Sequence, residues 1–213
     1  TEIALPQGPS EEWALVRHDD DTAEIGALLE LLSPAVHVLA PMSLADAELD
    51  AADRISDDDL PHGFASLRAQ LSQLLEVPLT PVYSRVELGG QIHVMACEPP
   101  VLVVGDEALG LPEGPELVFR LARALTFLWP GRAVGASRPG RVLRAVVLAI
   151  VREVAGTDVG HDDPLAAKAD AAIAMLPPAV RDQATAAAAR LLALSGGGLN
   201  LSAWAKSLTR SAD

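Results

Sequence analysis

The sequence predicts an α+β fold that is mainly α-helical, with a small sheet of three or four short strands packed against a helical bundle. Apolar residues recur at helical spacing over long stretches towards both ends of the chain, which favours amphipathic helices there. In the middle, residues 82–104 contain short β-branched runs separated by Gly and Pro, which is typical of strands. Only 3% of the residues are aromatic although 50% are hydrophobic, so Ala, Leu and Val must build the core.

Residues 1–80 are expected to form an acidic, helical N-terminal part. One helix is predicted to begin after Asp19–Asp21, whose carboxylates suit a helix N-terminus, and to end at Ser33-Pro34. The β-branched run 35–40 fits a buried strand, and another helix is expected to open at Ser43. The most regular pattern lies in 61–78, where the apolar residues fall on one helical face: Phe64, Leu67, Leu71, Leu74 and Leu75.

Residues 81–213 are expected to begin with the sheet and to pack with the N-terminal part as one unit. The runs 82–88 and 92–97 flank Gly89-Gly90, which suggests a hairpin turn. A third run, 101–104, stops at Gly105, and Pro99-Pro100 is expected to break continuous pairing between the second and third runs. The stretch 105–114 is expected to be an ordinary connection from a strand to a helix.

The remainder of the chain predicts four further helices. The first starts near Pro115 and stops at 129–131. The second, within 138–156, is apolar on most faces and is therefore expected to be central and buried. A third begins with Asp163 and Pro164, and an Ala-rich helix follows from 177 to 194. Asn200 is predicted to cap a last helix.

The charge is unevenly distributed along the chain. Residues 1–80 contain 16 acidic and 3 basic residues, whereas residues 81–213 contain 13 of each. The resulting net charge of −13 makes nucleic acid an unfavourable partner. Between residues 120 and 152 there are seven arginines and no acid. Two interpretations stay open for that stretch: it is solvated or packed against the acidic part, or it contacts an anionic partner.

No apolar run approaches the roughly 20 residues that span a bilayer, so no membrane association is expected. The first residues show no signal-peptide pattern, and the single cysteine agrees with a reducing compartment, so a cytoplasmic location is expected.

The sequence predicts no cofactor or metal site. No two of the five histidines lie three or four residues apart, so no helix offers a paired imidazole site. The stretch 105–114 lacks the Lys-Ser/Thr pair of a phosphate loop and contains three acids. The remaining candidate nucleophile is Cys97, with His93 four residues away; along a strand the two would lie more than about 10 Å apart. A buried, structural cysteine is the favoured interpretation.

The order of features from residue 82 onward, two runs, a strand ending in Gly and then GPELVFRLARALTFL, resembles gluzincin metallopeptidases of family M48. In that resemblance Arg123 and Phe127 stand where the family has its two zinc histidines, and Ala124 stands at the catalytic glutamate. The terminal TRSAD resembles the family's later E-x-x-x-D motif, with Thr209 in place of the Glu ligand and Asp213 retained. The texture of the chain also resembles C-terminal regions of large tetratricopeptide-containing myxobacterial proteins. The resemblance therefore implies a metallopeptidase-like fold that has lost its chemistry, since Arg, Phe and Ala can neither ligate zinc nor act as the base.

These observations predict a non-enzymatic protein-interaction or scaffolding domain, a pseudopeptidase module of a larger regulatory protein. Its partners are expected to be another protein or adjacent domains of a longer chain. One alternative is a hydrolase that uses Cys97 or residues the sequence does not pair. Another is a binding domain for an anionic small molecule, contacted by Arg120, Arg123 or Arg144, because Arg suits forked recognition of carboxylates and phosphates.

Overall fold

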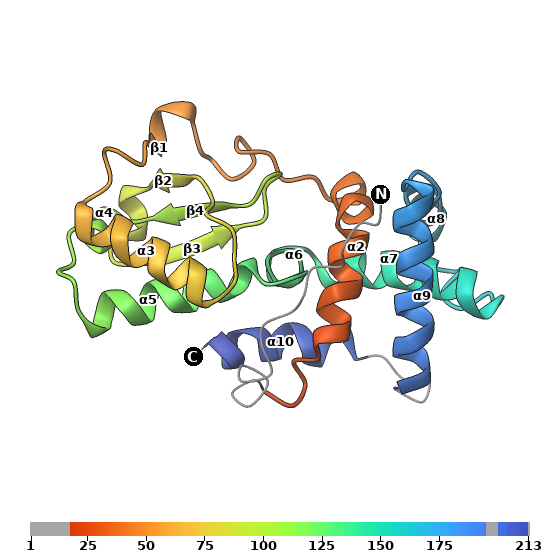
Figure 1. Ribbon diagram of the computed structural model, residues 1–213. Helices are drawn as coiled ribbons and strands as arrows, with labels where there is room; N and C mark the ends of the chain where they lie inside the picture. Colours follow the sequence, from red (N-terminus) through yellow and green to blue (C-terminus); the bar gives the residue numbers. More distant parts are fainter. Residues whose placement is uncertain (1–17, 195–199, 213) are drawn as a thin grey trace. The chain divides into compact units, whose positions relative to one another are not determined.

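The computed structural model describes residues 18–194 and 200–212, and these form two compact units (Figure 1). The helical unit consists of 18–41, 130–194 and 200–211, and the sheet unit consists of 42–129. The charge pattern suggested a boundary between residues 80 and 81, whereas the units meet after residues 41 and 129. Residues 18–41 pack with helices that follow residue 130, whereas 42–80 contribute a strand and a helix to the sheet unit. The predicted fold class, α+β and mainly helical, is confirmed.

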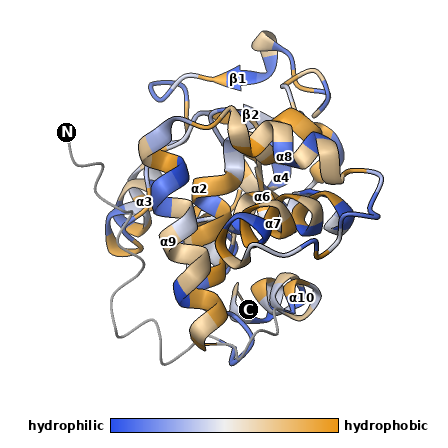
Figure 2. Cartoon of the chain, turned by 90° about the vertical axis from the view of Figure 1, so that its right-hand side faces the viewer, coloured by the Kyte–Doolittle hydropathy of each residue, from blue (hydrophilic) through white to orange (hydrophobic). Residues whose placement is uncertain are grey.

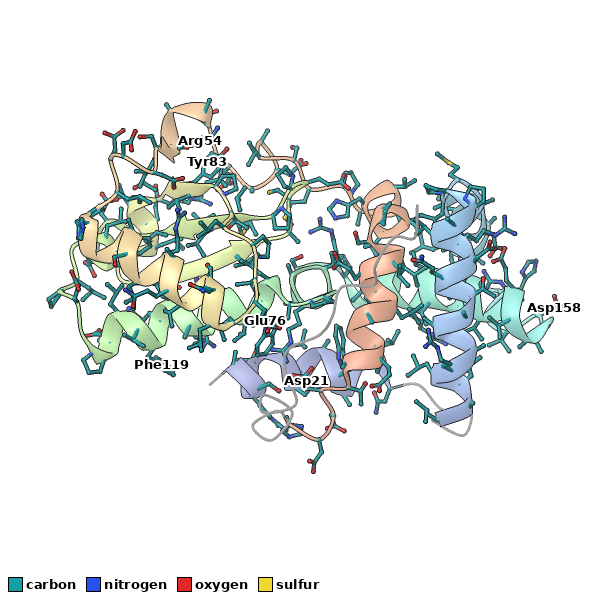
Figure 3. The ribbon with its side chains drawn as sticks, in the orientation of Figure 1. Asp21, Arg54, Glu76, Tyr83, Phe119 and Asp158 are labelled. Atoms are coloured by element: carbon teal, nitrogen blue, oxygen red, sulfur yellow. The ribbon has the colours of Figure 1, made fainter. Side chains whose placement is uncertain are left out.

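The sheet unit is built around a mixed four-stranded sheet with the order β1-β2-β4-β3. The strands are β1 (Arg54–Ile55), β2 (Val82–Ser84), β3 (Ile92–Met95) and β4 (Val101–Val104). β4 pairs in parallel with β2 and antiparallel with β3, and β1 is antiparallel to β2 at one edge. Figure 3 labels the edge pair Arg54 and Tyr83, which are partners in the register of β1 and β2.

β4 lies between β2 and β3, and its four residues are buried on both faces of the sheet. Leu102 and Val104 face a core formed with α3 (His62–Leu74) and α5 (Pro115–Leu125). Val101 and Val103 face a smaller cluster with Tyr83, Cys97 and residues from the segment that precedes β1. The short helices η1 (Ala51–Asp53), η2 (Val86–Leu88), α4 (Asp106–Leu109) and η3 (Thr126–Leu128) complete this unit.

The hairpin expected around Gly89-Gly90 is wrong, since β2 and β3 lie on opposite sides of β4. The chain leaves β2 through η2, and Gly89, with φ +52°, turns it towards the end of β4. Gly105 packs so closely on the backbone of Gly89 that a Cβ at Gly105 would overlap it. The antiparallel pair is instead β3 with β4, and both prolines, 99 and 100, lie in their connection rather than interrupting the pairing.

The helical unit is formed by α2 (Ala23–Leu39), α6 (Arg132–Ser137), α7 (Gly140–Ala155), α8 (Ala166–Ala174), α9 (Pro178–Leu194) and α10 (Leu201–Ala212). In Figure 1, α2 and α9 run side by side and α7 crosses them. α7 is the predicted buried helix, and each of its expected core residues is buried: Val142, Leu143, Val146, Val147, Ile150 and Val151. Asn200 caps α10 as predicted, since its side-chain oxygen accepts a bond from Ala203 N at 2.9 Å.

The strand expected at 35–40 is wrong, because α2 continues through Pro34 to Leu39. Ala35 and Val36 extend the buried stripe of Leu28, Leu29 and Leu32 at helical spacing, so burial outweighs the helix-breaking effect of proline.

The helix expected to open at Ser43 is also wrong, since residues 44–48 form turns. Ser43 and Asp46 bond to each other there, and the bond from Ser43 N to Asp46 Oδ2 is 2.8 Å. This bond pattern lowers the pKa of the exposed Asp46 carboxyl, chiefly through the Ser43 backbone N–H. The side chains of Ser43 and Asp46 thus accept hydrogen bonds from each other's backbone N–H groups, which a helix is not needed to provide.

Two sets of contacts connect α6 with the residues that precede α2 within the helical unit, one directly and one through α10. Asp21 and Arg132 form an ion pair whose side chains are 3% and 4% exposed. The indole of Trp204, on α10, donates to the carbonyl oxygen of Thr22 at 3.2 Å and packs against Gly135, where a Cβ would overlap the ring. Among the described residues, every helix is too short or too polar to span a bilayer.

Candidate functional site: a basic groove in the helical unit

A groove of about 1280 Å³ lies in the helical unit. We call it the basic groove. Its walls come from α6, α7 and α10, with the segment that follows α7 and Leu192 of α9. The cationic residues that line it are Arg138, Arg141, Arg144 and Lys206, and none of the described lining residues is acidic.

The sequence of α7 explains the chemistry of this groove. Val142, Val146 and Ile150 are buried on one side of the helix. On another side, Arg141, Arg144, Leu148, Val151 and Ala155 follow one another at spacings of three or four residues, and all line the groove. In Figure 2 the ribbon of α7 is largely hydrophobic in colour, with hydrophilic segments on it. The groove therefore has an aliphatic floor and cationic positions on the same helix.

α10 forms another wall of the groove, and like α7 it has one buried side and one side that lines the groove. Trp204, Ser207 and Leu208 are buried, whereas Ala205 and Lys206 line the groove. Because Trp204 is 1% exposed and bonded to Thr22, α10 is held firmly against the rest of the helical unit.

The arginines of this chain differ in how they are neutralised. In the part of the chain that the structure describes, Arg152 pairs with Asp170, Arg181 with Glu153 at 2.6 Å, and Arg132 with Asp21. By contrast, Arg141, Arg144 and Lys206 are exposed and have no ion-pair partner among the described residues. Arg138 is buried and donates to Ser137 Oγ at 3.0 Å. The groove is consequently a local positive region on an acidic protein.

The arginines predicted as possible anion or partner contacts belong to different units. Arg144 lies in the basic groove. Arg120 and Arg123 are on α5 of the sheet unit, where Arg120 bonds to the carbonyl oxygen of Gly90 and to Glu116 Oε1, the latter at 2.6 Å. The sequence does not distinguish Arg138, Arg141 and Lys206 from the other basic residues. The first two belong to the acid-free arginine stretch, but only folding distinguishes them from the arginines that are paired.

The residues that resemble a degenerate zinc motif are divided between the two units. Ala124 is buried in the core of the sheet unit, and α5 ends at Leu125, so Phe127 lies in the following 3-10 helix rather than one turn along the same α-helix as Arg123. Thr209 is exposed on α10 in the helical unit, and Asp213 lies outside the described residues. The described residues contain no group of three or more metal-ligating side chains.

Cys97 and His93 have different surroundings in the sheet unit. Cys97 is buried, as expected, in the cluster with Tyr83 and Val103, and its thiol lies 3.8 Å from the carbonyl oxygen of Ser43. His93 is exposed on β3, with Nε2 2.7 Å from Gln91 Oε1. Partial desolvation and, secondarily, the charge of Arg123 lower the pKa of His93.

Comparison with known proteins adds no relative to this description. No family model matches the chain, and neither the curated proteins nor the solved structures contain a match.

Proposed function

We propose that this chain is a non-catalytic protein-interaction domain and that the basic groove is its binding surface. The observation that supports this most directly is the groove itself: a long aliphatic floor beside Arg141, Arg144 and Lys206, three exposed cations without ion-pair partners among the described residues. A docking partner could bury apolar side chains against the aliphatic floor and place carboxylates beside the cations, and both contributions stabilise protein interfaces.

We also propose that the module is a pseudopeptidase-like part of a larger regulatory protein. Arg123 and Phe127 supply no zinc ligand and Ala124 no base, so a peptidase reaction has no groups at those positions. The hydrolase alternative that uses Cys97 requires an accessible thiolate, and Cys97 is only 3% exposed. An anionic small molecule is the remaining alternative, because Arg141 and Arg144 would suit a carboxylate or phosphate.

Site-specific photo-crosslinking in the full chain tests the proposed function. A benzophenone amino acid replaces Ser202, which lines the groove, or Lys168, an exposed residue on α8 outside the groove. We expect a discrete protein adduct from the position in the groove and none from the control position. Equal adducts from both positions, or none from either, would contradict an interaction surface at the groove. Turnover of peptides by the purified protein would contradict the non-catalytic assignment.

A further inference from the structure

We infer that the partner of the basic groove is an amphipathic α-helix that carries carboxylates at one end and aliphatic side chains along the rest of one face. This inference rests on the proposed function, because it specifies what docks in the groove. It follows from the size of the groove, the type of its walls and the distribution of charge along α7.

The size of the groove favours a polypeptide segment over a small molecule. Ligand pockets for small molecules occupy roughly 300–1,000 Å³, and this groove holds about 1280 Å³. Its lining extends along α7 from Arg141 to Ala155, which at 1.5 Å per residue corresponds to about 21 Å. A helix of about four turns has the same length.

The walls of the groove favour a helix over an extended strand. An extended peptide binds by adding to an exposed sheet edge, where backbone groups await partners. The groove is lined mainly by α6, α7 and α10, whose backbone groups are already bonded within the helices, and no described strand borders it. A helix docks instead through side chains at positions i, i+3, i+4 and i+7, which match a floor of Leu148, Val151 and Ala155.

The arginines at the start of α7 and the aliphatic residues that follow them lie at different ends of this helix, which implies an orientation for a bound partner helix. Arg138, Arg141 and Arg144 lie before and in the first turns of α7, whereas Val147, Leu148, Val151 and Ala155 follow them. Carboxylates on the partner would meet the exposed guanidinium groups of Arg141 and Arg144, each of which offers a fork of donors, and aliphatic side chains would meet the other end. Nucleic acid fits less well, because its phosphates would be uniformly spread while most of the groove is apolar and the whole chain carries a charge of −13.

Fluorescence anisotropy with a labelled helical peptide tests this inference on the full chain. The peptide has about 15 residues, Glu at helical spacing in its first two turns and Leu at i, i+3, i+4 and i+7 in the remainder. Its two controls are a scrambled peptide of equal composition without an apolar face and a peptide with Lys in place of Glu. We expect the acidic amphipathic peptide to bind at least about tenfold more tightly than either control.

Charge reversal in the protein locates the binding. Arg144→Glu should weaken binding of the acidic peptide by about tenfold, and Lys168→Glu, an equal charge change outside the groove, should leave it nearly unchanged. Arg144 is exposed, so its replacement leaves the fold intact, which the circular dichroism spectrum verifies. The Arg141→Glu, Arg144→Glu double variant should now prefer the Lys peptide. If Lys168→Glu leaves the preference for the acidic peptide in place, the swap identifies contact between the charged ends rather than a general effect of net charge.

The outcomes separate the inference from the proposed function. If Ser202 yields a protein adduct but the acidic peptide binds no better than its controls, the partner class is wrong and the interaction surface stands. If anionic vesicles or an acyl phosphate bind in an Arg144-dependent way while the peptide does not, the groove holds a lipid-like anion and the inference fails. Concentration-dependent dimers that Arg144→Glu dissociates would also overturn it, in favour of a second copy of this chain.

Discussion

The contact between Gly135 and Trp204 yields the sharpest prediction about stability. Replacing Gly by Ala inside a helix normally stabilises a protein by about 0.5–1 kcal/mol. At Gly135 the added methyl group would overlap the six-membered ring of Trp204. The ring has nowhere to go, because Trp204 is 1% exposed and its Nε1 is bonded to the Thr22 carbonyl oxygen. Overpacking of this kind costs about 1–3 kcal/mol. We therefore expect Gly135→Ala to lower the free energy of unfolding by about 1–2 kcal/mol, against the helix propensity.

A double-mutant cycle separates this contact from other effects of the substitution. Trp204→Leu costs stability by itself, but it opens space beside residue 135, so Gly135→Ala should be neutral or stabilising in that background. The coupling energy should then be about 1–3 kcal/mol. Gly140→Ala is the matched control, because nothing lies within 4 Å of a Cβ built there. Urea unfolding followed by circular dichroism measures all four variants. Equal effects of Gly135→Ala and Gly140→Ala, or additivity with Trp204→Leu, would refute the close contact.

Three further predictions concern other parts of the chain. Asp21→Ala leaves the buried guanidinium of Arg132 without its carboxylate and should lower the free energy of unfolding in urea by about 3 kcal/mol; a loss below about 1 kcal/mol would show that the pair is solvated. On α5, Leu121→Ala should cost about 2–5 kcal/mol because Leu121 is fully buried, whereas Phe119→Ala should cost far less because Phe119 is 51% exposed on the outer side of the helix (Figure 3); the reverse order would mean that α5 presents another face to the sheet. His93 has a lowered pKa in the folded state, so the unfolded chain binds more protons as the pH falls below the ordinary value of 6.5, and stability declines. His93→Gln should reduce that decline in urea titrations between about pH 8 and about pH 5; an unchanged or steeper slope would contradict the assigned direction.

The sequence alone determined the class of the fold and the approximate position of most helices. Apolar residues at helical spacing identified α3, although Leu74 of the predicted apolar face is 61% exposed, and the apolar faces of 138–156 identified α7 as a buried helix. The run 101–104 before Gly105 identified the strand β4. Local chemistry also set several helix starts, such as Pro115 and the Asn200 cap, because those signals depend only on neighbouring residues.

Tertiary structure determined which segments became partners. A short apolar run such as 35–40 suits a strand or a buried helix, and only the packing of α2 against the helices that follow residue 130 selects the helix. Strand order likewise depends on what covers each face, so Gly89-Gly90 became a turn against β4 rather than a hairpin. The basic groove follows the same logic. Seven arginines were visible in the sequence, but whether a guanidinium meets a carboxylate or an open groove depends on residues far away along the chain.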